Sequence, residues 1–316
     1  MPDVFLGEVA HAVGDLHESV EDAGHHGRLL SSPAALREAG FARHAYCSAG
    51  TTSYDLARRA VAPLESRIRG ADVLVYATSL PINGNVGDLE RYRSTRDVKY
   101  LMDFPVSHLQ ADLDLTGAMV VGINQLACAS LIAGIRVAAM ILRSEPHLHK
   151  ALCVTADRFP EGALYEQSYN LISDGAAACL VTREPGELRI LGGHGITNGA
   201  MAFASDDQTI GSYFTYTHRL ITELLARHHM SIADVSWIVP QNVNIVTWQV
   251  LGSLLGFDLD RVLSPTMPEV GHMISGDNIV NLGRLLEEGR FQPGERILMP
   301  MAGYGLNWQC LLLEKV

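Results

Sequence analysis

Cys128 is the side chain best suited to chemistry, within NQLACASLIAGI (124–135). The apolar run that follows it predicts a helix beginning close to the cysteine. A thiol at a helix N-terminus lies at the positive end of the helix dipole, which lowers its pKa and favours the nucleophilic thiolate. The Cys128 N–H, with no partner inside the helix, would also suit an oxyanion. The stretch alone leaves a second interpretation open, because a buried cysteine is a common small hydrophobic residue.

A nucleophilic cysteine needs a base and fixed hydrogen-bond donors, and three other segments offer them. His272, in EVGHMISGD, is the best-placed base. Gln241, Asn242 and Asn244, in VPQNVN, follow an apolar run that predicts a buried strand. Their amides suit a carbonyl, or they are ordinary turn residues. MAGYGLNW (301–308) either brings a backbone N–H to a substrate or forms a hairpin turn.

The composition excludes several other classes of function. The chain has 316 residues, is 47% apolar and 19% charged, and has a formal net charge of −11. An acidic chain of this kind lacks the basic footprint of a nucleic-acid-binding protein. Five irregularly spaced cysteines without a CxxC pair indicate a reduced, cytoplasmic protein without disulfides. The histidine pairs lack nearby carboxylate or thiolate partners, so we expect no metal site.

Two segments could be mistaken for membrane or export signals. MPDVFLGEVA has two acidic residues and no basic leader, which is not typical of a signal peptide. The uncharged run 117–135 is interrupted by Asn124 and Gln125, so it predicts a buried strand, AMVVGI, followed by a buried helix. We therefore expect no membrane association.

One pattern of elements occurs twice along the chain. Segments 56–79 and 218–241 each predict an amphipathic helix, a turn and a buried strand, and each contains Ala-Asp-Val at the turn. A Gly-containing strand precedes each segment, at 4–14 and 188–197. Alternating helices and strands predict an α/β layered fold, and the repetition predicts two similar halves. Cys128 and His272 then occupy comparable helix starts, and their loops should meet near the pseudo-twofold axis.

Two further groups of residues have less certain places. Residues 82–103 have no counterpart in the second half and are predicted to be an inserted loop or short helix. A set of aromatic residues could shape a pocket, although the sequence does not place them: Tyr165, Tyr169, Phe203, Phe214 and Tyr216.

Taken in chain order, these segments resemble the thiolase superfamily, in particular the ketoacyl-ACP synthase III-like enzymes. ACASLIAG resembles the nucleophile segment, with Cys128 as the acyl-accepting residue. SDGAAACLV (173–181) is similar to a GDGAAA strand. PGERILMPMAGYGLNW resembles the C-terminal glycine-rich signature, and this match implies that the Tyr304 N–H completes the oxyanion hole.

The chain departs from the family pattern at the two partners of the cysteine. The family histidine belongs in a segment resembling VPHQAN, where Gln241 stands here, and the family asparagine belongs in a Gly-Asn-Thr turn, where His272 stands here. Decarboxylative condensation needs two donors around a thioester carbonyl to stabilise an enolate. Gln241 can donate but cannot take a proton, whereas His272 can do both. We therefore expect acyl transfer, with Claisen condensation and a weakly active partner subunit as alternatives.

The resemblance also bears on the acyl donor. The segment similar to the coenzyme A clamp, SSPAALREAGFARHAY, has no tryptophan before Arg37, which puts adenine stacking in doubt. An acyl carrier protein is the other candidate donor. Such carriers are acidic, and Arg91, Arg93 and Arg96, with Lys99, could form a local basic patch. The alternative is a solvated charged loop. Either donor would be a substrate, and no permanently bound cofactor is expected.

The resemblance implies a thiolase-like, five-layered αβαβα fold of two pseudo-duplicated halves. We expect an N-terminal half at 1–183, carrying Cys128 and the insertion, and a C-terminal half at 184–316 that carries the partner residues. The family's subunits commonly pair, so a homodimer is expected. The expected function is to load an acyl group onto Cys128 from a coenzyme A or carrier-protein thioester. The acyl group then passes to a small-molecule acceptor in specialised, polyketide- or fatty-acid-like biosynthesis.

Overall fold

In a computed structural model that describes residues 2–167, 170–202, 204–304 and 306–316, nine strands form one continuous mixed sheet. The strands of the first half are β1 (Phe5–Val13), β4 (Val73–Ala77), β5 (Met119–Ile123), β6 (Lys150–Asp157) and β9 (Gly175–Thr182). Those of the second half are β10 (Leu188–Thr197), β11 (Trp237–Ile238), β12 (Arg296–Gly303) and β13 (Asn307–Lys315). The sheet order is β11-β12-β13-β10-β1-β9-β6-β4-β5.

The two halves of the sheet share one topology. In each half the first strand pairs antiparallel with the last, β1 with β9 and β10 with β13. The last strand also pairs antiparallel with the strand before it in the sequence, β9 with β6 and β13 with β12. β6 and β12 in turn pair in parallel with the second strand of their half, β6 with β4 and β12 with β11. A parallel bridge between Ile238 and Val262 occupies the place that β5 has in the first half. Only two residue pairs, Phe5 with Arg189 and Leu6 with Leu188, join β1 to β10 and so connect the halves.

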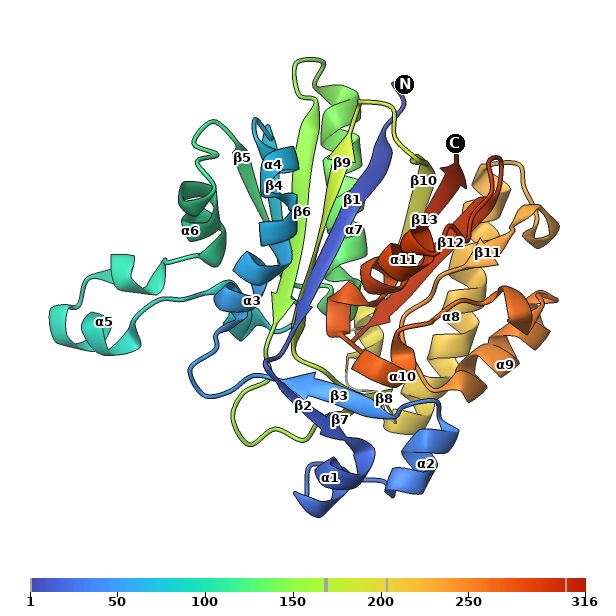
Figure 1. Cartoon of the computed structure of the whole chain (residues 1–316), viewed down its shortest axis with the longest axis horizontal. Coiled ribbons are helices and arrows are strands. Elements are labelled where there is room, and N and C mark those ends of the chain that lie inside the picture. The colour runs from blue at the N-terminus through green and yellow to red at the C-terminus, as the bar shows by residue number, and fades with distance from the viewer. Residues whose placement is uncertain (1, 168–169, 203, 305) are drawn as a thin grey trace.

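Helices complete five layers, because each helix buries one apolar face on a sheet. α3 (Ser53–Val61) covers the outer face of the first half, and α8 (Asp206–Arg227) covers that of the second (Figure 1). α7 (Ser130–Ser144) and α11 (Asp277–Glu287) lie between the halves and contact strands of both. The largest apolar cluster joins these two helices to both halves of the sheet. The expected αβαβα architecture of two pseudo-duplicated halves is therefore confirmed.

Smaller elements surround the layers. They are β2 (Leu16–Ser19), α1 (Val20–His25), α2 (Pro33–Glu38), β3 (Arg43–Tyr46), α4 (Glu65–Ile68), α6 (Pro105–Asp112), β7 (Glu166–Gln167), β8 (Asn170–Leu171), α9 (Ile245–Leu255) and α10 (Met267–Val270). The region 82–103 contains α5 (Leu89–Thr95), which has no buried residue and extends away from the body of the molecule (Figure 1).

The prediction for AMVVGI is wrong in one respect. The segment does form a strand, β5, but this strand is the edge of the sheet, and the Met119 and Val120 side chains are exposed. The apolar run that follows, Ala127–Ser144, is long and apolar enough to cross a bilayer by length and composition. However, 56% of it is buried inside the fold, as in the core helix of a layered protein.

Candidate active site

Cys128 lies in a short turn between β5 and α7. A 3₁₀ turn, Ala127–Ala129, leads directly into the first residue of α7. Ala127 has φ +46°, a left-handed conformation that costs energy in a residue with a Cβ and that the surrounding structure must hold in place. Cys128 is half-buried, whereas Cys47, Cys153, Cys179 and Cys310 are buried. Burial raises the pKa of Cys47 to about 12. Cys128 is therefore the cysteine most accessible to a substrate.

The β12–β13 hairpin brings backbone against the Cys128 turn. A Cβ added at Gly303 would collide with the Leu126 carbonyl and would lie 2.8 Å from the Cys128 nitrogen and 3.0 Å from the Ala129 nitrogen. Only glycine permits this approach. MAGYGLNW is thus a hairpin turn, and one that places backbone beside the candidate nucleophile. Tyr304 is the next residue, and its side chain is 54% exposed.

His272 reaches Cys128 from the second half of the chain. Gly271 has φ +61°, which allows the chain to turn from α10 toward the site. The His272 N–H donates to the Leu171 carbonyl at 2.7 Å, and the His272 carbonyl accepts from the Ser173 N–H at 2.9 Å. These bonds fix the backbone of His272 beside β8. Its side chain is buried, and the Cys128 thiol is among the neighbouring groups that raise its pKa.

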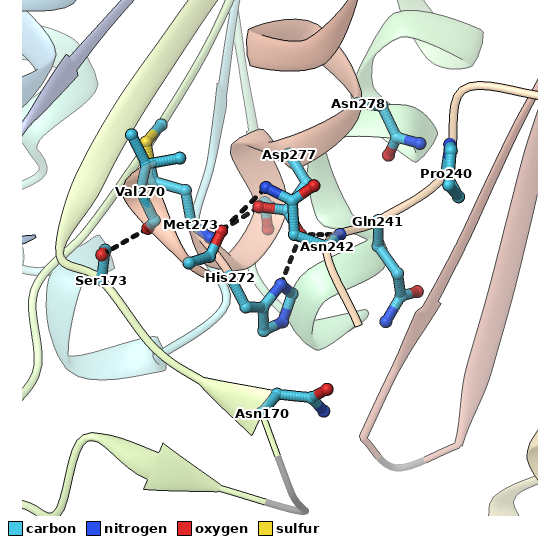
Figure 2. A network of polar contacts seen from close by, with 12 residues as sticks. Asn170, Ser173, Pro240, Gln241, Asn242, Val270, His272, Met273, Asp277 and Asn278 are labelled. Carbon is cyan, nitrogen blue, oxygen red and sulfur yellow. Dashed lines mark hydrogen bonds and ion pairs between the residues drawn. The ribbon is translucent and has the colours of Figure 1, made fainter. Parts of the chain in front are cut away.

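A buried carboxylate holds the other side of the His272 ring. Asp277 is the first residue of α11, and it pairs with His272 Nδ1 (Figure 2). It also accepts hydrogen bonds from the Asn242 N–H at 2.7 Å and the Met273 N–H at 2.5 Å. The helix N-terminus further stabilises its negative charge. Cys128, His272 and Asp277 thus form a thiol–imidazole–carboxylate series.

Two opposing effects set the protonation of His272. Burial lowers its pKa, but the Asp277 carboxylate, with a smaller contribution from Cys128, outweighs burial and raises the pKa to about 10. At neutral pH the ring is therefore an imidazolium held by the Asp277 carboxylate.

The amides of VPQNVN have three different environments. Gln241 Oε1 accepts the Ala302 N–H at 2.5 Å, so the Gln241 NH₂ faces away from that bond. Asn242 is fully buried and donates from Nδ2 to the Gly271 carbonyl at 2.8 Å, which braces the turn before His272. Asn244 caps α9 through its side-chain oxygen, and its N–H donates to Asn170 Oδ1 at 3.0 Å. Figure 2 shows Gln241 and Asn170 extending from different segments toward the same region as His272.

The arginines proposed to contact the donor lie at the surface. Arg37 makes a two-bond ion pair with Glu21 at 2.6 Å. Arg93 pairs with Glu90, which also lies on α5. The Arg91 guanidinium carbon lies 4.9 Å from the centroid of the Tyr100 ring. Arg96 ends α5 in a left-handed conformation.

Asp277 was not predicted from the sequence as a residue of this site, and Asn242 was predicted only as an amide donor to a carbonyl. A signal for Asp277 was present, since an acidic residue in SGDN stands at the start of the helix predicted after His272. The bracing role of Asn242 has no such signal, because its contacts with Gly271 and Asp277 join segments about 30 residues apart.

A thiolase-like fold with a cysteine at the start of the central helix defines a class of acyl-transferring and condensing enzymes. Residues 123–199 match the family described as 3-oxoacyl-[acyl-carrier-protein (ACP)] synthase III, and residues 225–315 match its C-terminal domain. The chain belongs to this family of transferases.

Named relatives agree with this assignment. Beta-ketoacyl-[acyl-carrier-protein] synthase III of Acidiphilium cryptum is 23% identical over 91% of this chain and 92% of its own length. The corresponding protein of Wolbachia pipientis wMel is 24% identical over 60% of this chain, and the match spans 65% of its length.

Among solved structures, ChlB3, described as an acyltransferase, superposes with a TM-score of 0.81 at 20% identity, covering 100% of this chain and 98% of its own. FabH of Pseudomonas aeruginosa PAO1 superposes with a TM-score of 0.80 at 18% identity, covering 99% and 98%. At these identities the structural likeness supports the fold alone.

Proposed function

We propose that the protein is a thioester-dependent acyltransferase that carries its acyl group on Cys128 and passes it to a hydroxyl or amine of a small molecule. The observation that carries this proposal is the series Cys128–His272–Asp277, in which the thiol interacts with a single imidazole that a buried carboxylate holds. This arrangement is the one that nucleophilic catalysis followed by general-base catalysis requires.

The first half-reaction follows from the charges at the site. The Cys128 thiolate attacks the thioester carbonyl, and the Cys128 N–H with the backbone after Gly303 stabilises the oxyanion. The tetrahedral intermediate collapses by breaking the bond to the donor sulfur. The departing thiolate takes the proton from the His272 imidazolium and leaves as a thiol. The products are acyl-Cys128, a neutral His272 and the free thiol of coenzyme A or a carrier protein.

The second half-reaction uses the neutral imidazole. His272 accepts the proton of the acceptor hydroxyl or amine as that group attacks the acyl carbonyl, and Asp277 stabilises the imidazolium that forms. The C–S bond breaks, and the Cys128 thiolate with its imidazolium partner is restored. The Gln241 NH₂ is a donor for a substrate carbonyl. Decarboxylative condensation is the second candidate, favoured by family membership, but the site offers only one amide at the position of the family histidine.

Two assignments about partners belong to this proposal. The donor is an acyl thioester of coenzyme A or of an acyl carrier protein. An acidic carrier would bind the exposed Arg91, Arg93 and Arg96, which lie on α5 and at its C-terminal end. The protein is a homodimer that pairs through β5, because this strand leaves an open edge and exposes the apolar Met119 and Val120. The exposed Phe104 continues this apolar surface, and together with the buried Val106 it lines a hollow of about 290 Å³ beside β5.

The test is intact-mass spectrometry after mixing the protein with acyl thioesters. We expect a mass gain of one acyl group that is absent in Cys128→Ala, and loss of that gain when a competent alcohol or amine is added. Release of carbon dioxide from a malonyl donor, with carbon–carbon bond formation, would instead favour condensation. Turnover by Cys128→Ala at the wild-type rate would contradict the covalent mechanism altogether.

A further inference from the structure

A hydroxyl from the second half of the chain contacts the peptide group before Cys128. Ser275 lies in a 3₁₀ turn, Ile274–Gly276, which leads into α11, and its side chain is buried. The Ser275 hydroxyl donates to the Ala127 carbonyl at 3.2 Å. This carbonyl and the Cys128 N–H belong to one planar peptide group. The hydrogen bond to the carbonyl therefore also fixes the direction of the N–H.

Ser79, which lies just after β4, orders the Ser275 hydroxyl in turn. The two Oγ atoms lie 2.6 Å apart. Because a carbonyl can only accept, the single hydroxyl hydrogen of Ser275 goes to Ala127, and Ser79 is the donor between the two hydroxyls. The backbone of Ser79 is fixed by the buried Asp157, which accepts its N–H at 2.8 Å. A continuous series of hydrogen bonds therefore leads from Ser79 through Ser275 to the peptide before Cys128.

Ser275 is the donor that ties this peptide to the second half of the chain. The Ala127 carbonyl also accepts the Ser130 N–H, but that bond lies within the Cys128 turn and moves with it. The backbone is strained on both sides of the contact, since Ala127 has φ +46° and Ile274, directly before Ser275, has φ +50°. Left-handed conformations cost energy in residues other than glycine and persist only where the surroundings impose them. Loss of the Ser275 bond would therefore let the peptide turn and relieve its strain.

We propose that Ser275 is a positioning residue that acts through the peptide between Ala127 and Cys128 and holds the Cys128 N–H in the direction of the oxyanion. This inference rests on the proposed acyl-Cys128 mechanism, in which that N–H stabilises the negative oxygen. A hydrogen bond to a peptide carbonyl also polarises the group, so its N–H becomes a stronger donor. Ser275 therefore assists the step in which negative charge develops on a carbonyl oxygen, and it leaves the nucleophilicity of the Cys128 thiolate unchanged.

The experiment compares two reactions of Cys128, each followed by intact-mass spectrometry. Acylation by acetyl, butyryl or hexanoyl coenzyme A passes through an oxyanion, whereas alkylation by iodoacetamide displaces iodide and forms none. In Ser275→Ala we expect the rate of acylation to fall at least about tenfold and the rate of alkylation to stay within about twofold. Ser79→Ala should give the same split with a smaller fall, because Ser275 keeps its bond to Ala127. The double variant should be no slower than Ser275→Ala, since the two hydroxyls act in series.

Ser130→Ala provides the matched control. Ser130 is a buried serine at the start of α7, two residues after Cys128, and its hydroxyl has no hydrogen-bond partner within the part of the chain that the structure describes. Its loss should leave both rates unchanged.

Two results in Ser275→Ala would overturn the positioning role while leaving the proposed function intact. They are unchanged acylation, and an equal fall in acylation and alkylation while thermal unfolding shows a folded protein. If Ser275→Ala does not fold, Ser79→Ala decides by the same comparison. If none of the thioesters acylates the wild type although iodoacetamide alkylates Cys128, that result would count against the proposed function itself.

Discussion

His272 owes its chemistry to two neighbours rather than to its position alone. The Asp277 carboxylate and the Cys128 thiol oppose the effect of burial, so that the imidazole holds a proton at neutral pH. A histidine this deeply buried without such partners would be neutral. The family resemblance leads us to expect a histidine at Gln241. The histidine present at this site is instead His272, whose own carboxylate partner lies five residues further along the chain.

Asp277→Asn should lower the turnover rate by about 10²–10⁴-fold, because the substitution removes the charge that orients and stabilises the imidazolium. Acyl-transfer rates measured across pH should also show a lower apparent pKa for His272 in the variant. Asp174→Asn makes a useful comparison, since Asp174 is a buried carboxylate that accepts the Tyr165 hydroxyl rather than pairing with the imidazole. A wild-type pH profile in Asp277→Asn would contradict the role assigned to Asp277.

The same contact makes folding stability depend on pH. The pKa of His272 is raised in the folded state from 6.5 to about 10, so the stabilisation is fully present below pH 6.5 and is lost as pH rises toward 10. Urea unfolding of the wild type should therefore give a smaller free energy at pH 10 than at pH 7. Asp277→Asn should show a weaker dependence over this window. An equally steep decline in both proteins would assign the effect to other groups.

Among the elements, the β12–β13 hairpin and the Cys128 turn approach each other closely through their backbone atoms. Gly303→Ala should reduce acylation of Cys128 by at least about tenfold, because the added Cβ would meet backbone atoms that cannot move without displacing the Cys128 N–H from the oxyanion. Thermal unfolding should show that the variant remains folded. Gly117→Ala is the control, since a Cβ there meets nothing within 4 Å. Equal acylation rates for the two variants would show that the approach of Gly303 does not matter.

The sequence was informative wherever periodicity and local order decide the structure. The repeated helix–turn–strand pattern predicted two matching halves, and the positions of Cys128 and His272 at comparable helix starts predicted that they would meet. The sequence was uninformative where contacts between segments far apart in the chain decide the structure. AMVVGI is apolar enough for a buried strand, yet it is exposed because no further strand of this chain follows it in the sheet. Tyr165 was one of five aromatic candidates, and only the fold shows that it belongs to the apolar cluster against which Cys128, Tyr46 and Phe159 pack.

The other aromatic candidates illustrate the same limit. Phe214 and Tyr216 pack on α8 in the cluster that covers the second half of the sheet, where Tyr216 stacks on Trp308 at 4.5 Å. Tyr169 and Phe203 lie outside the described residues. Residue type alone could not separate an aromatic residue of the cluster that includes Cys128 from one in the outer layer of the core, because both bury aromatic surface.

For the whole molecule, the open edge of the sheet at β5 is the surface where we expect a second subunit to bind. An exposed apolar edge strand tends to associate unless a charge or another strand protects it, and the described part of β5 carries neither. Val120→Lys should therefore shift the mass measured by light scattering from twice 34.3 kDa to 34.3 kDa at micromolar concentration. Val250→Lys is a close control, because Val120 is 38% exposed and Val250, on α9, is 39% exposed. A monomeric wild type, or equal effects of the two lysines, would rule out pairing through β5.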